Sequence, residues 1–428
     1  MNRFHVTSLR DATLLPEGEI ALVPSSNLVT GERDLRRRFP TLTTLEADLL
    51  VLAAAIFAAD RGSLRGQRED VCRHFNVRLP VANAARIGPV IPLLERALHT
   101  LSNDSWTLVL DDSRQLPEER VATTKAGDIT LLFSGGLDSL AAAIEFGRAP
   151  VPLQLVSHIT RNRVIDLAQE ELAALLQANG YNVAHHQVFV SSRTRLGLVH
   201  DVENSQRTRS FVFLVLGALV ARRTESFDLV YLAENGQMAI HLPLTSARVS
   251  AFSTHTAHPD VLADMQTALS EILDVPIRII NPYVHRTKAE VVAPIIAALP
   301  QAVRLSNSCW KSARLPAGIN HCGECVPCLE RRIAISSLTA DSTFYLRDLF
   351  AEDFSQLEED DEGRRNLYDL VEFVVRMAEL PPEAVMSEWP DLYSRHIDAN
   401  AVIAMYKRFA ADARAVLSTT RVAGGLFA

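Results

Sequence analysis

The sequence predicts an α/β protein with a parallel sheet, preceded by an α+β region and followed by a helical region. Three observations lead to this prediction. Apolar runs alternate with helical stretches from residue 129 onward, a loop with two glycines joins the first run to a helix, and strand-like runs stop after about residue 340. We therefore expect an N-terminal domain and linker (1–126), a core (127–340) and a C-terminal helical extension (341–428).

Composition narrows the class of protein. A chain of 428 residues is long enough for two or three domains, and 48% hydrophobic with 22% charged residues is typical of a folded, soluble protein. The net charge of −8 does not favour general nucleic-acid binding. The longest apolar runs, LLVLAAAIFAA and FVFLVLGALVA, are too short to cross a membrane, and the N-terminus lacks the apolar segment of a signal peptide. We expect a cytoplasmic protein without membrane association.

The N-terminal region mixes helical and strand-like segments. Residues 42–60 predict a helix, with Thr43 or Thr44 as its cap. The further elements expected here are a strand at 75–81, a helix near 88–102 and a strand at 106–112. The polar stretch SRQLPEERVATTKAGD follows, and we interpret it as the linker to the core.

The core shows the rhythm of crossover units. Strand-like runs alternate with helical stretches, which predicts a parallel sheet. The expected strands lie in ITLLFS, VPLQLVSHI, NVAHHQVFV, FDLVYLAEN and PIRIINPY, and the expected helices include VIDLAQEELAALLQANG and RSFVFLVLGALVARRT. In the C-terminal region, NLYDLVEFVVRMAEL and AVIAMYKRFAADARAVL predict amphipathic helices, and Pro381 and Pro382 separate elements.

The loop SGGLDS follows the first core strand and begins a helix, at the sheet edge where such folds bind ligands. Its glycines let the backbone approach an anion, and the serine hydroxyls, amides and helix dipole all favour negative charge. Asp138 is itself an anion, so we expect it to hold Mg²⁺ or to cap the helix. The alternative is an ordinary capped turn. The candidate nucleotide-binding residues are Ser134, Gly135, Gly136, Leu137, Asp138 and Ser139.

Other polar residues follow strands at the same edge. Glu234, Asn235 and Gly236 come after FDLVYLA, and His158 and Arg161 come after the second strand, where they are candidates to contact nucleotide or substrate. Asn-Gly is also a common turn, which is the alternative at 235–236. Two further sets favour structural roles: His185 and His186, expected in packing or at the surface, and Cys72 beside His74.

Four of the five cysteines lie close together, at Cys309, Cys322, Cys325 and Cys328. Four thiolates at this spacing predict a closed, structural zinc site. An iron–sulfur cluster uses the same ligand set and is the alternative metal centre. His321 is either a substitute ligand or a solvent-facing residue.

The loop SGGLDS resembles the pyrophosphate loop SGGxDS of the N-type ATP pyrophosphatases (PP-loop family), and the cysteines narrow the resemblance. Together with the motif Cys…CGxCxxCxxR, which ends here at Arg331, they make residues 128–338 similar to the 7-cyano-7-deazaguanine synthases (QueC). The resemblance assigns catalytic roles to Asp138, to Lys288 in NPYVHRTKAEVV and to Arg209 in QRTRSFVF. Ser210 replaces the asparagine of the family's motif, and the loops VSHITRNRV and AENGQMAIHLPLT differ from the family's pattern.

The resemblance implies a reaction. ATP, Mg²⁺ and a structural Zn²⁺ would serve to adenylate the carboxylate of a 7-deazaguanine acid, and an amine would then displace AMP to form an amide. The added regions resemble those of enlarged, synthase-like proteins of bacterial antiviral defence, which implies a protein amine as acceptor. The alternatives are a synthase that uses ammonia and forms the nitrile, a tRNA thiolase and a non-catalytic scaffold. A homodimer is compatible with each of them.

Overall fold

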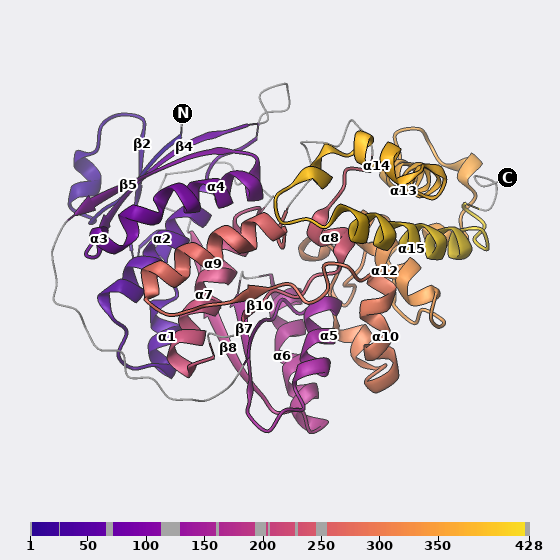
Figure 1. Cartoon of the computed structure of the whole chain (residues 1–428), viewed down its shortest axis with the longest axis horizontal. Coiled ribbons are helices and arrows are strands. Elements are labelled where there is room, and N and C mark those ends of the chain that lie inside the picture. The colour runs from indigo at the N-terminus through magenta and orange to yellow at the C-terminus, as the bar shows by residue number, and fades with distance from the viewer. Residues whose placement is uncertain are drawn as a thin grey trace.

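The computed structural model describes residues 2–24, 26–65, 72–112, 129–159, 162–192, 203, 206–226, 230–244 and 255–423. The expected linker and the candidate residue Arg161 lie outside this described part. Figure 1 shows the N-terminal sheet at the upper left and the C-terminal helices at the upper right, with the central sheet and its helices below.

The central sheet has five strands in the order β11-β10-β6-β7-β8, and every neighbouring pair is parallel. The strands are β6 (Thr130–Leu132), β7 (Leu153–Ile159), β8 (Val183–Phe189), β10 (Val230–Tyr231) and β11 (Ile279–Ile280). All five correspond to the runs predicted from the sequence. The chain adds β7 and β8 on one side of β6 and then returns to add β10 and β11 on the other. This reversal places a ligand-binding crevice beside β6.

Helices cover both faces of the central sheet. One face packs against α5 (Leu137–Phe146), α6 (Arg163–Ala178) and α10 (Lys288–Ala298), which share a hydrophobic core with β6 and β7. The other face packs against α7 (Arg209–Thr224) and α9 (Pro259–Leu273). Because both faces are covered, β6 and β7 are buried at almost every position, whereas β8 at the edge of the sheet is buried at fewer.

The N-terminal region contains a second parallel sheet in the order β2-β1-β4-β5. Helix α2 (Thr44–Arg61) begins at the predicted Thr43 cap, whose side chain accepts from the N–H of Glu46 in a capping box. The predicted β4 (His74–Val81) and β5 (Ser105–Asp112) form; β1 (Asn2–Val6) and β2 (Glu19–Leu22) were not predicted. The remaining elements are α1 (Glu32–Arg38), α3 (Ala84–Ile87), α4 (Ile91–Ser102) and β3 (Leu28–Val29), which pairs with β9 (Ser191–Ser192).

The N-terminal sheet and the central sheet share one hydrophobic core. A single cluster of buried side chains joins α2 and β4 to α7, α9 and β6. An ion pair across this interface is fully buried: the guanidinium of Arg223 on α7 donates to both carboxylate oxygens of Glu46 on α2. The N-terminal region is thus packed firmly against the core.

The C-terminal region is helical, as predicted, with α13 (Glu362–Glu379), α14 (Pro382–Glu388) and α15 (Ala399–Leu417). Pro382 occupies the first position of α14, where a missing N–H costs nothing. The apolar faces of these helices pack on α8 (Gly236–Ile240) and α12 (Val326–Ser336), which belong to the core region. Figure 1 shows α15 running alongside α8 and α12. The helical region therefore covers the end of the core that carries the cysteines.

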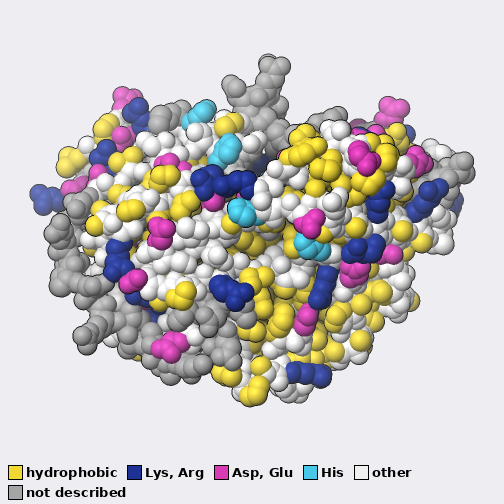
Figure 2. Space-filling view, in the orientation of Figure 1, with side chains coloured by type: hydrophobic (Ala, Val, Ile, Leu, Met, Phe, Trp, Pro, Cys, Tyr) yellow, Lys and Arg dark blue, Asp and Glu magenta, His cyan; other side chains and the backbone are white. Residues whose placement is uncertain are grey.

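No helix in the described part of the chain is long and apolar enough to span a membrane. On the face drawn in Figure 2, acidic and basic side chains are interspersed. This distribution agrees with the modest net charge of the sequence.

Candidate functional site

The loop between β6 and α5 is tightly constrained. Gly135 has a φ of 81°, and a Cβ added there would lie 3.1 Å from Cγ of Gln169. Ser134 accepts a hydrogen bond from the N–H of Gly136 (3.3 Å), and the hydroxyl of Ser139 donates to the carbonyl of Gly136 (3.2 Å). A glycine at 135 is required by both its backbone conformation and its neighbours.

The remaining loop residues differ in what they offer. The side chain of Leu137 is fully buried in the core, so its only polar contribution to a ligand is its backbone. Asp138 does not cap α5, because no side-chain cap is formed at this helix. The capping role considered for Asp138 is thus wrong.

Asp138 instead contacts two residues that come from distant parts of the sequence. Its Oδ2 accepts from Nζ of Lys288 (2.8 Å) and from Nδ2 of Asn235 (2.9 Å). Its Oδ1 is buried and has no hydrogen-bond partner in the described structure. The carboxylate is therefore held on one side and free to bind a ligand on the other.

The order of the strands explains why these three residues meet. The loop that carries Asp138 follows β6, Asn235 follows β10, and Lys288 begins the helix after β11. Lys288 is fixed further by its backbone N–H, which donates to Oε1 of Gln237 (2.6 Å). The carboxyl ends of three adjacent strands thus supply an acid, an amide and an ammonium to one point.

Glu234 lies beside this group. Burial raises the pKa of Glu234 to about 7, and Asp138 adds to the effect, whereas the hydrogen bond from Thr256 and the charge of Lys288 oppose it. Its backbone N–H donates to Oδ1 of Asn281 (3.2 Å), which fixes the strand end. This carboxyl group is poised to change protonation near neutral pH.

Asn235 and Gly236 do not form an isolated turn, because both contact other segments of the chain. Asn235 caps α8 through its Oδ1, which accepts from the N–H of Met238 (3.3 Å). A Cβ at Gly236 would collide with the carbonyl of Val284 and lie 2.6 Å from Cε of Met405. The position admits glycine because backbone and side chains from two other segments approach it.

His158 lies within β7 and not after it as expected, and Arg209 is the first residue of α7. His158 is fully buried between the rings of Phe57 and Phe213, and its Nε2 lies 2.8 Å from the carbonyl of Val190. Burial lowers the pKa of His158 to about 3. Arg209 donates to the carbonyl of His158 (3.4 Å), and burial lowers its pKa to about 10. Among the described contacts neither residue touches Asp138, so their nucleotide-binding and catalytic roles stay predictions.

The four cysteines form one buried cluster, with all sulfur atoms within 4.8 Å of one another. The Sγ atoms of Cys309 and Cys325 are 3.8 Å apart, and those of Cys322 and Cys328 are 3.9 Å apart. A tetrahedral site with Zn–S bonds of about 2.3 Å has sulfur atoms about 3.8 Å apart. The cluster therefore fits a structural zinc ion.

His321 is not a fifth candidate ligand. It is buried, and its Nε2 accepts from the backbone N–H of Ser308 (3.3 Å). Burial lowers the pKa of His321 to about 3, and Arg331 adds to the effect. Both earlier interpretations of this residue, as substitute ligand and as solvent-facing side chain, are wrong.

Arg331 connects the cysteine cluster to the nucleotide loop. Its fully buried guanidinium donates to the carbonyl of Val303 (2.5 Å) and to the hydroxyl of Ser306 (2.9 Å). The next residue, Asn307, donates its N–H to the carbonyl of Gly135 (3.0 Å). The segment 303–307 thus contacts both α12, which carries Arg331, and the glycine loop, so a shift of α12 would also move the loop.

A pocket that the sequence did not reveal opens next to this site. It spans about 590 Å³, including its mouth, and lies between α8, α12, α13 and α15. Its lining includes Gln237, whose amide oxygen binds the backbone of Lys288, and Glu330 on α12. In the sequence, Glu330 stands two residues after the last of the four cysteines. Nothing about that position predicts a pocket.

The other singled-out residues are structural or exposed. His185 and His186 lie within β8 and contact Ser157 and Gln154, respectively, each at 2.8 Å, as expected for packing. Cys72 is exposed, so it is not a buried structural cysteine.

Comparison with known proteins agrees with this geometry. Residues 128–339, just under half of the chain, match the family model described as queuosine biosynthesis protein QueC. Comparisons with curated proteins and with solved structures find no match. QueC proteins are enzymes of the ATP pyrophosphatase type that act in deazaguanine chemistry. Residues 128–339 are thus similar to the QueC family, and the observed parallel sheet and four-cysteine cluster agree with that similarity.

Proposed function

We propose that this protein uses ATP to adenylate the carboxylate of a 7-deazaguanine acid and then joins the acyl group to an amine. The carboxylate oxygen attacks the α-phosphorus and pyrophosphate leaves. The amine nitrogen then attacks the acyl carbon, AMP leaves, and the amine loses a proton. Activation is needed because an unmodified carboxylate would have to expel oxide.

The observation that carries this proposal is the contact between Asp138 and Lys288 beside the glycine loop. The loop amides and the N-terminus of α5 favour the departing pyrophosphate, and Lys288 supplies positive charge at the phosphates. The protein has to position two anions and offset their charge, which is mainly an electrostatic task.

The free oxygen of Asp138 supports a role for Mg²⁺. Oδ1 is buried without a partner in the described structure, and a carboxylate oxygen is a ligand that Mg²⁺ prefers. When bound, the ion would offset charge on the phosphates. Asn235 and Lys288 would keep the other oxygen in place.

We further propose that the acceptor is an amine of a partner protein, in the context of antiviral defence. The motivation is the resemblance to enlarged, synthase-like proteins and the presence of a folded N-terminal region and a helical C-terminal region outside the matched span. These regions provide a surface for binding a partner protein. An enzyme whose acceptor is a small amine would not need such a surface.

The test is incubation of the zinc-loaded protein with ATP and 7-carboxy-7-deazaguanine, alone, with ammonia, and with proteins encoded by neighbouring genes. Pyrophosphate release and the masses of all products are measured. A partner protein whose mass increases by the deazaguanine acyl group supports the proposal. Free nitrile as the sole product would instead indicate a synthase that uses ammonia.

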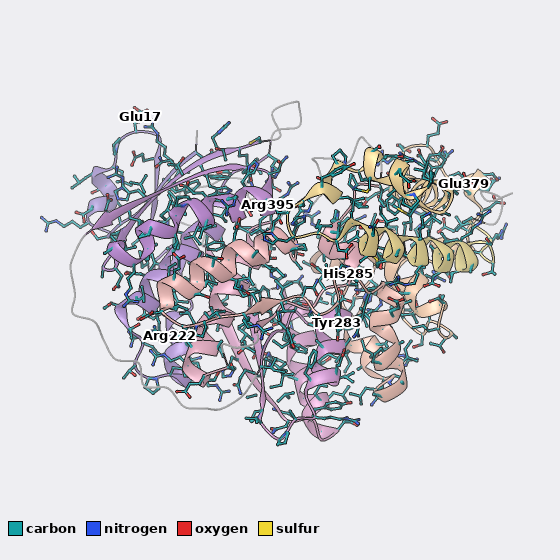
Figure 3. The ribbon with its side chains drawn as sticks, in the orientation of Figure 1. Glu17, Arg222, Tyr283, His285, Glu379 and Arg395 are labelled. Carbon is teal, nitrogen blue, oxygen red and sulfur yellow. The ribbon has the colours of Figure 1, made fainter. Side chains whose placement is uncertain are left out.

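Asp138→Asn separates an enzyme from a scaffold, with Glu379→Gln as the control. Figure 3 shows Glu379 at the outer edge of the C-terminal helices. We expect Asp138→Asn to abolish pyrophosphate release, and Glu379→Gln to behave as wild type. Wild-type protein that binds ATP and zinc but never releases pyrophosphate would favour the scaffold.

A further inference from the structure

The pocket beside the Asp138 group has the lining of a small-molecule site, with apolar walls and a few polar side chains. Its walls are mostly apolar and come from both the core and the C-terminal helices, including Leu242, Val326 and Phe373. Such walls suit a planar ring that packs its faces against apolar side chains and presents polar groups at its edge.

Two buried polar side chains line this pocket with unused hydrogen-bonding capacity. Glu330 is 7% exposed, and its carboxylate forms no hydrogen bond or ion pair with any residue that the structure describes. Gln237 is 4% exposed, and its Nε2 has no partner in the same described part. Buried polar groups are costly without partners, so a ligand that supplies them is favoured.

The pocket is connected directly to the proposed reaction centre. The amide oxygen of Gln237 is occupied by the N–H of Lys288, which turns its Nε2 toward other partners. Glu330 lines the same pocket as Gln237, and helices α10 and α12, which carry Lys288 and Glu330, pack against each other. A ring held in the pocket would therefore place a substituent near the phosphates.

We propose that this pocket binds the 7-deazaguanine ring, with Glu330 as the residue that determines specificity. Glu330 accepts hydrogen bonds from the ring N1–H and from the 2-amino group, and Nε2 of Gln237 donates to the 6-carbonyl oxygen. This inference rests on the proposed function and names the residues that select its substrate.

The chemistry of the two side chains selects this type of ring edge. An ionised carboxylate only accepts hydrogen bonds, and its two oxygens match two adjacent donors. An adenine ring presents an acceptor at N1 and a donor at its 6-amino group, which is the reverse of the edge proposed here. In its ionised form, Glu330 would thus disfavour the adenine of ATP in this pocket.

The test compares two acids on two proteins. Wild-type and Glu330→Gln proteins are assayed for pyrophosphate release with 7-carboxy-7-deazaguanine and with the analogue that lacks the 2-amino group. We expect Glu330→Gln to lower kcat/KM for the full substrate by about 10- to 100-fold, the range for loss of a bidentate contact. For the analogue, we expect a difference between the two proteins of less than about 5-fold, because one of the two hydrogen bonds is already missing.

Several readouts separate this inference from a structural effect of the substitution. The zinc content and the KM for ATP should match wild type in Glu330→Gln, and Glu379→Gln should match wild type throughout. Equal losses for both acids, or no loss for either, would overturn the role of Glu330 while leaving adenylation intact. If wild-type protein adenylates neither acid, the proposed function fails, but calorimetry with 7-deazaguanine still tests the pocket. Binding to wild type that is weaker in Glu330→Gln supports the role of Glu330. No binding, or equal binding to both proteins, overturns that role.

Discussion

The ammonium of Lys288 lies 2.8 Å from Oδ2 of Asp138, although 150 positions separate the two residues in the chain. Both side chains are nearly buried, with exposed fractions of 10% and 12%. A charge in such a place needs its partner, because removing one member leaves the other desolvated and unpaired. A substitution that breaks this contact should therefore lower both the free energy of unfolding and the activity.

Replacing Lys288 with Met should lower both activity and stability. We expect pyrophosphate release to fall by at least about 100-fold, as for loss of one group that stabilises transition-state charge. The free energy of unfolding should fall by about 3 kcal/mol because the nearly buried Asp138 loses its cationic partner. Adding Asp138→Asn to this variant should restore much of the stability but none of the activity, as measured by urea denaturation and phosphate assays. A double variant no more stable than Lys288→Met would contradict the ion-pair argument.

Replacing Gly236 with Ala should disturb the site from a distance. The new Cβ would meet the carbonyl of Val284 and the Cε of Met405, and overpacking of this kind costs about 1–3 kcal/mol. The shift displaces Asn235, which donates to Asp138, so the rate should fall as well. Gly88→Ala is the control, because no atom lies within 4 Å of its added Cβ, and its effect should stay below about 1 kcal/mol.

Glu234 should make stability depend on pH. Burial raises the pKa of Glu234 from 4.5 to about 7, so between these values the folded protein binds more protons than the unfolded chain. Stability then falls as the pH rises through this window and becomes level above it, with a total loss of up to about 3 kcal/mol. Glu234→Gln removes this titration. Its unfolding free energy should match wild type at pH 4.5 and exceed it at pH 8; parallel profiles would show that Glu234 titrates normally.

Arg331 should affect the nucleotide loop without supplying a metal ligand. Arg331→Lys loses hydrogen bonds to Val303 and Ser306, which position the segment that donates to Gly135. We expect an increase of about 5-fold or more in the KM for ATP, consistent with the loss of about 1 kcal/mol. The zinc content, measured by mass spectrometry, should not change. Arg332→Lys is the neighbouring control, since Arg332 pairs with Asp348 at the surface. Loss of zinc in Arg331→Lys would show that the residue supports the cluster instead.

Tyr406 should link the C-terminal helices to the pocket. Its hydroxyl donates to the carbonyl of Gln237 and accepts from the N–H of Leu242, both at 3.1 Å. Tyr406→Phe leaves that buried N–H without its acceptor, which costs about 1–3 kcal/mol. We expect the KM for the acid to rise by about 5-fold or more, with a smaller change for ATP. Tyr393→Phe, at an exposed position, should leave both KM values unchanged; equal effects of the two substitutions would argue against this link.

Local patterns in the sequence were sufficient for much of the fold. The apolar runs predicted all five strands of the central sheet, and a cap at Thr43 or Thr44 predicted the start of α2, which the structure places after Thr43. The spacing of the four cysteines predicted a buried cluster that fits zinc. Such features depend on neighbours within a few turns of the chain, so composition and spacing encode them directly.

Tertiary structure decided which residues share the site. His158 was expected after a strand at the ligand-binding edge, yet it lies within β7 and packs against Phe57 and Phe213, because the N-terminal region covers that face of the sheet. Conversely, Glu330 gave no signal in the sequence and lines a pocket that the C-terminal helices complete. The sequence by itself determined the strands, the glycine loop and the cysteine cluster; only the order of strands and the docking of the flanking regions decided which side chains meet there. The physical reason is that such contacts arise from packing between segments far apart in the chain, which local periodicity does not specify.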